Sequence, residues 1–388
     1  MKILVASHTY IVKLNCEKLR QLAQLEPNTE VTVVVPQRWH PGGVQNKLVE
    51  SQPWSDGSFR VVPLGNFSQN NQGLLTFGFD IVQLLQQFRP QIIQVEQGAK
   101  ALGYAQLITL NKLLGLKAKN LFFTWWNLPY SSKFPVSWLE RFNLQQTDGI
   151  ISGNQDGADI LREHGFRGPI KVMPQLGVDE ELFCPRTELE LASKLGIEPD
   201  EFVVGFVGRF VEEKGLLTLV DALKELALPW KLLLLGRGPL KETILEKAKQ
   251  ARIEERLIIV ESVPHDQVSR YINVMSTLVL PSETTAKFKT LTAAGWKEQF
   301  GHVLIEAMAC KVPVLGSDSG EIPNVIGNTG LIFPEGDAQA LQHCIQQLIE
   351  QPQLTQQLAQ MGYERAMKNY TNRALARQQL DFYQELTQ

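Results

Sequence analysis

Short runs of mostly aliphatic residues alternate along the chain with segments in which apolar residues recur at helical spacing. The runs at 3–6, 31–35, 92–95 and 121–124 predict buried strands, and leucines at helical spacing follow the first of them. Strands that are apolar on both faces are typical of parallel sheets that helices cover on each side. The pattern therefore predicts an α/β fold of doubly wound units.

The second half of the chain repeats this rhythm of strands and helices. Further strands are expected at 149–152, 170–173, 202–207, 231–235, 257–260, 278–280 and 312–315. Helices are expected at about 76–88, 100–114, 216–226, 240–252 and 303–310. Two Rossmann-like units of this kind account for the whole chain.

The length of 388 residues allows two or three domains at about 150 residues each. Pro174, Gly177, Pro185 and Pro199 cluster among acidic residues, as is typical of a linker between domains. We therefore expect a first domain over 1–180 and a second that begins at 181.

Composition excludes several classes of protein. The net charge of −3 gives no general basic field for nucleic acid. Four cysteines are scattered singly, without a C-x-x-C pair, so neither a zinc knuckle nor a disulfide framework is indicated. No run approaches the roughly 18–20 apolar residues of a membrane span. Reduced thiols and a cytoplasmic location, soluble or peripheral, are expected.

The first motif with chemical content is G-F-V-G-R at 205–209, followed by E-K-G at 213–215. It follows a strand and precedes a helix, where small residues such as Gly208 let a ligand approach the backbone. Arg209 and Lys214 add two cationic donors that suit a diphosphate. The alternative is a plain turn with surface charges. Neither a Walker loop nor G-x-G-x-x-G after the first strand is present.

The second motif is L-G-R-G-P at 235–239, again between a strand and a helix. Gly236 and Gly238 leave room for a flat base or sugar beyond the carboxyl ends of the strands. The alternative is that these glycines serve only to turn the chain.

The third motif is E-Q-F-G-H-V-L-I-E, from Glu298 to Glu306. Glu298 precedes an expected helix and Glu306 lies about one and a half turns inside it. Two carboxylates so placed suit the vicinal hydroxyls of a ribose or hexose. The alternatives are a solvated surface residue for Glu298 and a structural hydrogen bond for Glu306.

In this order, together with S-G-E-I-P at 319–323 and G-L-I-F-P at 330–334, the motifs resemble those of the family 4 glycosyltransferases. The resemblance implies a GT-B fold: two Rossmann-like, doubly wound domains with an interdomain cleft. Residues 1–180 would bind the acceptor and 181–371 the nucleotide-sugar donor. The last helix, 372–388, would pack back on the first domain.

The resemblance also implies roles for individual residues. Arg209 and Lys214 would bind the donor diphosphate and stabilise its charge, Glu298 would hold the donor sugar, and Glu306 the ribose. Donor-binding positions would be Gly208, Arg209, Lys214, Gly236, Arg237, Gly238, Val263, Glu298, Phe300, Gly301, His302, Val303 and Glu306. Family members retain the anomeric configuration and need no metal, and we expect a UDP- or GDP-sugar as the donor. No cofactor is therefore expected.

The first half departs from the family pattern. The loop after the first strand lacks glycine and contains His8 instead, which is an acceptor-site candidate. Glu96 occupies the position where many members have a histidine near the reacting carbon, so it is a catalytic candidate. A hydrogen-bonding role for Glu96 is the alternative.

Further acceptor-site candidates are Trp125, Trp126 and Asn127, at the end of the strand at 121–124. Lysines 112, 117 and 119 could place the helix at 100–114 on an anionic membrane, and the long loop 282–297 could act as a lid.

The resemblance therefore implies a retaining, metal-independent glycosyltransferase that moves a hexose-type sugar to a carbohydrate or glycolipid acceptor. The alternatives are a sugar-nucleotide epimerase of GT-B fold and a non-catalytic sugar-nucleotide-binding protein.

Overall fold

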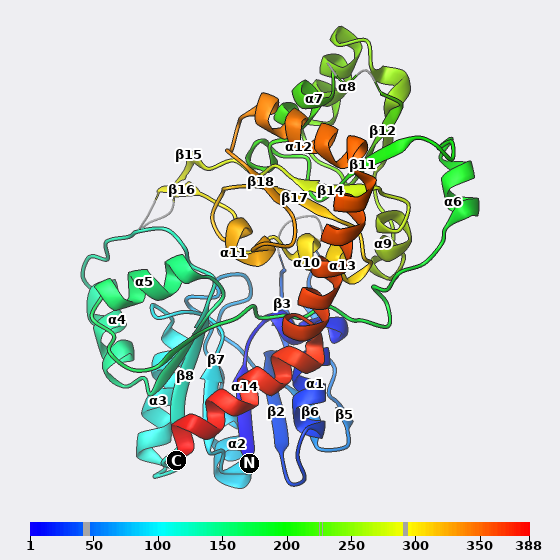
Figure 1. Cartoon of the computed structure of the whole chain (residues 1–388). Helices are drawn as coiled ribbons and strands as arrows, with labels where there is room; N and C mark the ends of the chain where they lie inside the picture. Colours follow the sequence, from blue (N-terminus) through cyan, green and yellow to red (C-terminus); the bar gives the residue numbers. More distant parts are fainter. Residues whose placement is uncertain (42–46, 225, 227, 290–293) are drawn as a thin grey trace. The chain divides into compact units, whose positions relative to one another are not determined.

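The computed structural model of the chain describes residues 1–41, 47–224, 226, 228–289 and 294–388. It divides into two compact units (Figure 1). Unit 1 comprises Met1–Gly177 and Asn372–Gln388, and unit 2 comprises Val178–Thr371. The first boundary follows Gly177, within the proline- and glycine-rich stretch, whereas the sequence placed it after residue 180.

Unit 1 is built on an eight-stranded sheet in the order β10-β9-β8-β7-β1-β2-β6-β5. The strands are β1 (Lys2–Ala6), β2 (Glu30–Pro36), β5 (Trp54–Asp56), β6 (Phe59–Leu64), β7 (Ile92–Val95), β8 (Lys119–Thr124), β9 (Gly149–Ser152) and β10 (Ile170–Val172). All neighbours are parallel except β5, which pairs antiparallel with β6. A separate small pair joins β3 (Arg38–Trp39) to β4 (Val49–Glu50).

Helices cover both faces of this sheet, as its apolar strands require. On one face lie α1 (Glu17–Gln24) and α14 (Asn372–Thr387), which pack against each other and against the sheet (Figure 1). On the other face lie α2 (Asp80–Phe88), α3 (Leu102–Leu113), α4 (Val136–Gln145) and α5 (Gln155–Glu163). The last helix of the chain is thus part of the core of unit 1.

Unit 2 contains a parallel six-stranded sheet in the order β13-β12-β11-β14-β17-β18. Its strands are β11 (Phe202–Val207), β12 (Trp230–Leu235), β13 (Leu257–Val260), β14 (Thr277–Leu280), β17 (Val314–Ser317) and β18 (Leu331–Phe333). The helices are α6 (Leu189–Lys194), α7 (Leu216–Leu223), α8 (Lys241–Gln250), α9 (His265–Ile272), α10 (His302–Ala309), α11 (Ile322–Ile326), α12 (Ala338–Glu350) and α13 (Pro352–Asn369). An antiparallel hairpin, β15 (Thr285–Lys289) and β16 (Ala294–Trp296), is inserted after β14.

The predicted α/β fold with two Rossmann-like units is confirmed, and the differences are local. The helix expected from residue 76 begins at Asp80, because Phe77 forms a bridge with Asn66 and bonds to the side chain of Gln106. The strand expected at 312–315 is shifted to Val314–Ser317. The sequence reading missed β5, β6 and β18, since Arg60 and Pro63 interrupt the apolar pattern of β6.

Candidate functional site

The sheet of unit 2 has a topological switch point between β11 and β14. From β11 the chain continues to β12 and β13 on one side, and it then returns to β14 on the other. In open parallel sheets a ligand crevice forms at the carboxyl ends of such strands. Arg209 and Lys214 follow β11, and Glu298 lies beyond the hairpin that follows β14.

The structure brings Lys214 and Glu298 together although they are 84 residues apart in sequence. The Lys214 ammonium lies 2.5 Å from Oε2 of Glu298, and the hydroxyl of Ser282 donates to the same oxygen at 2.7 Å. The Lys214 Nζ also lies 4.9 Å from the centroid of the Trp296 ring. Both charged side chains are mostly buried, with exposed fractions of 15% and 9%. Low exposure strengthens the attraction of this cation for its partners.

Arg209 differs from Lys214 in being open to solvent, since 61% of its side chain is exposed. Its Nη2 lies 3.5 Å from Oε1 of the buried Glu213. Because the guanidinium of Arg209 is solvated, this contact holds it only weakly. The guanidinium is therefore accessible to an anionic ligand beside the carboxyl end of β11.

The glycines of the first two motifs bring two loops into contact with each other. A Cβ atom on Gly236 would lie 1.8 Å from the carbonyl oxygen of Gly208, and one on Gly238 would lie 2.3 Å from that of Phe210. The Phe210 N–H donates to the carbonyl of Arg237 at 2.9 Å. The close contact between the two loops thus explains why residues 236 and 238 are glycines. The sequence pattern had instead indicated that these glycines leave room for a base or sugar. Backbone contact with a donor remains a prediction.

The amino end of α10 is formed as the third motif predicts. Gly301 precedes the helix with φ of 80°, a conformation that favours glycine, and His302 and Val303 form the first turn. Backbone N–H groups of a first turn have no partner within the helix and favour an anion. Phe300 is buried against the ring of Tyr370, with 5.8 Å between centroids, so it anchors the segment before the helix.

Glu306 lies inside α10 and is 7% exposed. Its Oε1 is 3.7 Å from Nε2 of His302. Burial raises the pKa of Glu306 to about 7. Because burial penalises the ionised carboxyl, hydrogen bonds from the hydroxyls of a ligand would stabilise it.

The remaining donor-site candidates occupy the loops after β12 and β13. Arg237 is exposed and Val263 is half-buried. These loops follow the carboxyl ends of β12 and β13, which lie beside β11 on one side of the switch point. The structure thus distributes the predicted donor residues along one edge of the sheet.

Sequence reasoning missed the contributions of Ser282 and Trp296. Ser282 comes two residues after β14, and its place at the carboxyl end of a strand is a signal that could have identified it. Trp296 had no such signal, because only the hairpin places its ring beside Lys214. Within the predicted lid at 282–297, residues 290–293 lie outside the described residues, and a closing motion remains a prediction.

Unit 1 has a corresponding switch point between β1 and β7, followed by His8 and Glu96. Glu96 is 4% exposed. Its carboxylate accepts hydrogen bonds from Tyr10 Oη at 2.9 Å, from Gln94 Nε2 at 2.8 Å and from Gln175 Nε2 at 2.6 Å. Tyr383 of α14 donates to Gln94 at 2.7 Å and extends the network. This enclosure favours the hydrogen-bonding alternative for Glu96 over the catalytic one.

His8 lines a separate pocket of about 610 Å³ in unit 1. Its ring lies 4.9 Å from that of Trp39, and burial lowers the pKa of His8 to about 4, so the ring is neutral at neutral pH. Within the described residues, its buried Nδ1 has no hydrogen-bond partner. The other lining residues, which the sequence reading missed, are Trp39, His40, Pro41, Asn70, Asn71 and Gln72.

The three residues after β8 have different environments. The indole of Trp125 donates to Gln175 at 3.0 Å, and its ring packs edge-on against Phe123. Trp126 is half-buried, and the ammonium of Lys100 lies 4.5 Å from its ring centroid. Asn127 is 3% exposed. Trp125 and Trp126 are thus both half-buried aromatic residues, whereas Asn127 is buried.

Three further observations concern metals, thiols and membranes. Among the residues that the structure describes, no group of three or more His, Cys, Asp or Glu side chains could hold a metal ion. All four cysteines are free. In the described part of the chain, no helix combines the length and apolar character needed to cross a bilayer.

Solved structures with the same architecture define the fold. The sucrose-phosphate synthase of Thermosynechococcus elongatus superposes with a TM-score of 0.71 at 20% identity, covering 100% of this chain and 99% of that one. HepE of Anabaena, solved in complex with UDP and glucose, has a TM-score of 0.68 at 18% identity, covering 99% and 100% of the two chains. The fold is GT-B.

Residues 188–365 match the family model of the glycosyl transferases group 1, so unit 2 carries the sequence pattern of that family. A curated relative is the N-acetyl-alpha-D-glucosaminyl L-malate synthase of Bacillus anthracis, 27% identical over 254 residues. That match covers 64% of this chain and spans 62% of the relative's own length.

Proposed function

We propose that the protein is a retaining glycosyltransferase of family 4, which moves a hexose-type sugar from a nucleotide-diphospho-sugar to a carbohydrate or glycolipid acceptor. The pairing of Lys214 with Glu298 at the switch point of unit 2 carries this proposal. The pair lies inside the segment that matches the glycosyl transferases group 1. Relatives named as glycosyltransferases of amylovoran and capsular polysaccharide biosynthesis support a role in polysaccharide formation.

The cationic groups would act on the leaving diphosphate. As the bond between the donor sugar and the diphosphate breaks, negative charge grows on the diphosphate oxygens. Lys214, Arg209 and the amino end of α10 present positive charge and N–H groups from preformed positions. Donors fixed before the reaction stabilise such charge most effectively. The same groups supply the charge neutralisation that a divalent cation supplies in other transferases, so we propose a metal-independent reaction.

The two carboxylates would hold the hydroxyls of the donor. Glu298 presents its carboxylate beside Lys214, so a sugar hydroxyl that donates to it would lie next to the diphosphate site. Glu306, inside α10, would accept hydrogen bonds from the ribose. These two contacts would orient the sugar and the nucleoside at the two ends of the diphosphate.

The acceptor would bind to unit 1. The pocket beside His8 and Trp39 offers an aromatic ring, two imidazoles and side-chain amides, a combination that suits a saccharide. His8 has a buried Nδ1 to which a hydroxyl could donate. We propose a saccharide or glycolipid as acceptor on this basis. A peripheral contact of the lysines at 112, 117 and 119 with anionic lipid also remains a prediction, which sedimentation with anionic vesicles tests.

The proposal is tested by ligand-induced thermal stabilisation. UDP and GDP are screened first and nucleotide sugars second, because a ligand that binds only the folded state raises the melting temperature by mass action. We expect one of the two nucleotides to raise it at millimolar concentration, and the matching nucleotide sugar to be consumed when a saccharide is added. The anomeric configuration of the product, read by proton NMR, then tests retention.

Three results would contradict the proposal in different ways. Absence of stabilisation by UDP and GDP would contradict a nucleotide-sugar site. Release of nucleotide with an isomerised free sugar, in the absence of any acceptor, would favour the epimerase alternative. Binding of a nucleotide sugar with no turnover across a panel of saccharides and glycolipids would favour the non-catalytic one.

A further inference from the structure

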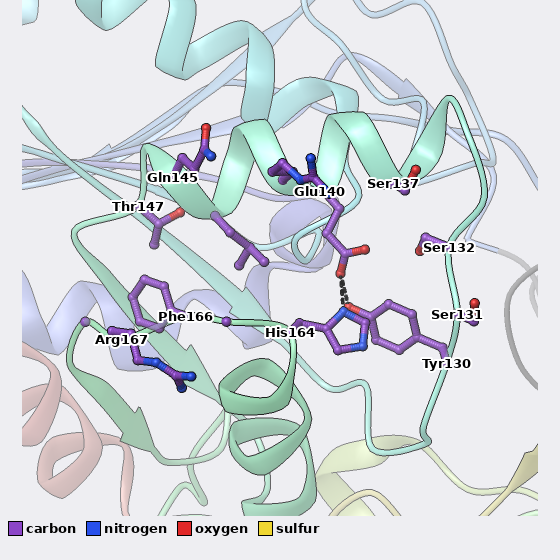
Figure 2. Close-up of a pocket in the computed structure, with 14 residues that line it drawn as sticks. Tyr130, Ser131, Ser132, Ser137, Glu140, Gln145, Thr147, His164, Phe166 and Arg167 are labelled. Atoms are coloured by element: carbon purple, nitrogen blue, oxygen red, sulfur yellow. Dashed lines mark hydrogen bonds and ion pairs between the residues drawn. The ribbon is translucent and has the colours of Figure 1, made fainter.

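Unit 1 contains a second pocket, separate from the one beside His8, with a volume of about 680 Å³ (Figure 2). It lies between the segment 130–132, which follows β8, helix α4, and the turn at 164–168, which precedes β10. Its volume falls within the roughly 300–1,000 Å³ of small-molecule sites. We call it the α4 pocket.

A buried carboxylate forms the centre of the α4 pocket. Glu140 is 5% exposed, and its Oε1 accepts hydrogen bonds from the hydroxyl of Tyr130 and, at 3.1 Å, from Nδ1 of His164. Figure 2 shows both partners converging on this oxygen from the two walls. Burial and the neighbouring Glu140 raise the pKa of Tyr130, so its hydroxyl stays protonated and donates. Both of these hydrogen bonds go to Oε1, and a carboxylate can accept more than two hydrogen bonds, so Glu140 can also accept from a ligand.

Other lining groups provide donors. Ser131, Ser137 and Gln145 contribute hydroxyl and amide groups, and Arg141 and Arg167 are exposed at the rim. The lining thus combines one buried carboxylate with two exposed guanidinium groups and several neutral polar groups. A ligand with many hydroxyls satisfies both the acceptor and the donors, and the arginines favour an acidic substituent on it.

The α4 pocket adjoins an acceptor-site candidate. The ring of Tyr130 lies 5.9 Å from that of Trp126, in an edge-to-face arrangement. The ammonium of Lys100 lies over both rings, 3.5 Å from the centroid of Tyr130 and 4.5 Å from that of Trp126. Contacts among Trp126, Lys100 and Tyr130 therefore connect the segment after β8 with the lining of the pocket.

We propose that the α4 pocket binds an acidic saccharide segment, a sugar residue bearing a carboxylate, of the acceptor chain. Glu140 accepts from the sugar hydroxyls, and Arg141 and Arg167 bind the carboxylate. This inference rests on the proposed transferase function for its biological use, but saccharide binding itself requires no donor.

The test is saccharide binding to the full chain by calorimetry, without nucleotide. The probe is a hexamer of galacturonic acid, and maltohexaose is the neutral comparison. We expect the acidic hexamer to bind more tightly than maltohexaose, and the double variant Arg141→Gln/Arg167→Gln to weaken it about fivefold. Ser137→Trp, which fills the pocket, is expected to weaken both ligands. Arg373→Gln, an exposed arginine on α14, is the matched control and should leave binding unchanged.

Melting temperatures of all variants establish that they are folded. Equal affinity for the two hexamers, no binding of the acidic one, or unchanged binding in both the double variant and Ser137→Trp would overturn the proposal. A second assay, consumption of the donor in the presence of a monosaccharide acceptor, distinguishes failure of the transferase proposal from failure of the saccharide-binding proposal. If that activity is absent while the pocket variants still lose saccharide binding, the transferase proposal fails and the binding site stands.

Discussion

Each unit has a buried glutamate in the segment that follows a strand next to the first strand of its sheet. Glu96 comes directly after β7 in unit 1, and Glu298 comes after the hairpin β15–β16 that is inserted behind β14 in unit 2. Glu298 faces the ammonium of Lys214, whereas Glu96 accepts hydrogen bonds from a phenol and two amides. The two carboxylates thus have different chemical surroundings.

This difference shows that the interaction partner of a buried glutamate determines its role more than its place in the sheet does. A cation held by a carboxylate near a crevice can also bind a ligand anion, and it leaves the carboxylate free to hold the ligand's hydroxyls. A buried carboxylate whose hydrogen-bond donors are neutral groups of its own unit contributes mainly to that unit's stability. Removing such a buried partner costs the desolvation of the groups left behind.

The largest expected effect is on Lys214. We expect Lys214→Ala to lower kcat/KM by about 10²–10³-fold, which corresponds to about 3–4 kcal/mol of lost charge stabilisation on the leaving diphosphate. Lys287→Ala is the matched control, because Lys287 pairs with Glu212 and its side chain is 71% exposed. Initial rates of nucleotide release measure both variants. A Lys214→Ala enzyme with normal rates would show that the pair is structural.

The variant Glu96→Gln tests whether Glu96 supports the stability of unit 1 and does not take part in catalysis. The amide cannot accept all the hydrogen bonds of Tyr10, Gln94 and Gln175, so we expect the free energy of unfolding to fall by about 2–4 kcal/mol. Urea denaturation measures the loss. We expect kcat of the folded fraction to stay within about threefold of the parent value. A hundredfold loss of kcat in a stable variant would instead assign Glu96 to catalysis.

A smaller effect concerns pH and Glu306. The pKa of Glu306 in the folded state, about 7, exceeds the ordinary carboxyl value of 4.5, so the folded state binds more protons than the unfolded state. The free energy of unfolding therefore falls as pH rises from about 4.5 to 7. Ribose hydroxyls that donate to the carboxylate favour its ionised form, so nucleotide affinity should rise over the same range, by up to about tenfold per pH unit.

Glu306→Gln is the control for this pH dependence, because the phosphate groups of the nucleotide titrate in the same range. We expect calorimetric titrations to show a shallower rise of affinity with pH in the variant. Identical pH profiles for the parent and the variant would exclude Glu306 from the nucleotide site.

The smallest effect is expected at Trp296, whose ring lies beside the Lys214 ammonium. Trp296→Leu removes the cation–π contact, worth about 1 kcal/mol, and should raise KM for the donor about fivefold. Trp296→Phe keeps an aromatic face and should restore most of the loss. Steady-state kinetics with a varied donor measure both. Equal behaviour of the two variants would show that the ring acts only through packing.

Local pattern was sufficient for much of the fold. The apolar runs of β1, β2, β11 and β12 can be recognised in the sequence because strands buried on both faces tolerate few polar residues. Strands at or next to the sheet edges, namely β5, β6 and β18, were missed. Arg60 and Pro63 interrupt the apolar pattern of β6, and β5 and β18 are only three residues long. The start of α2 was misplaced because a contact with Gln106, distant in sequence, holds Phe77 in extended backbone.

By itself the sequence determined the two-unit α/β architecture and the order of the donor motifs, because hydrophobic periodicity and glycine positions are local properties of the chain. Only the tertiary structure paired Lys214 with Glu298, placed Trp296 beside them and enclosed Glu96 among Tyr10, Gln94 and Gln175. Burial and the identity of a partner depend on residues far apart in sequence, so no local pattern records them. Those two quantities determine whether a glutamate meets a ligand or supports the fold.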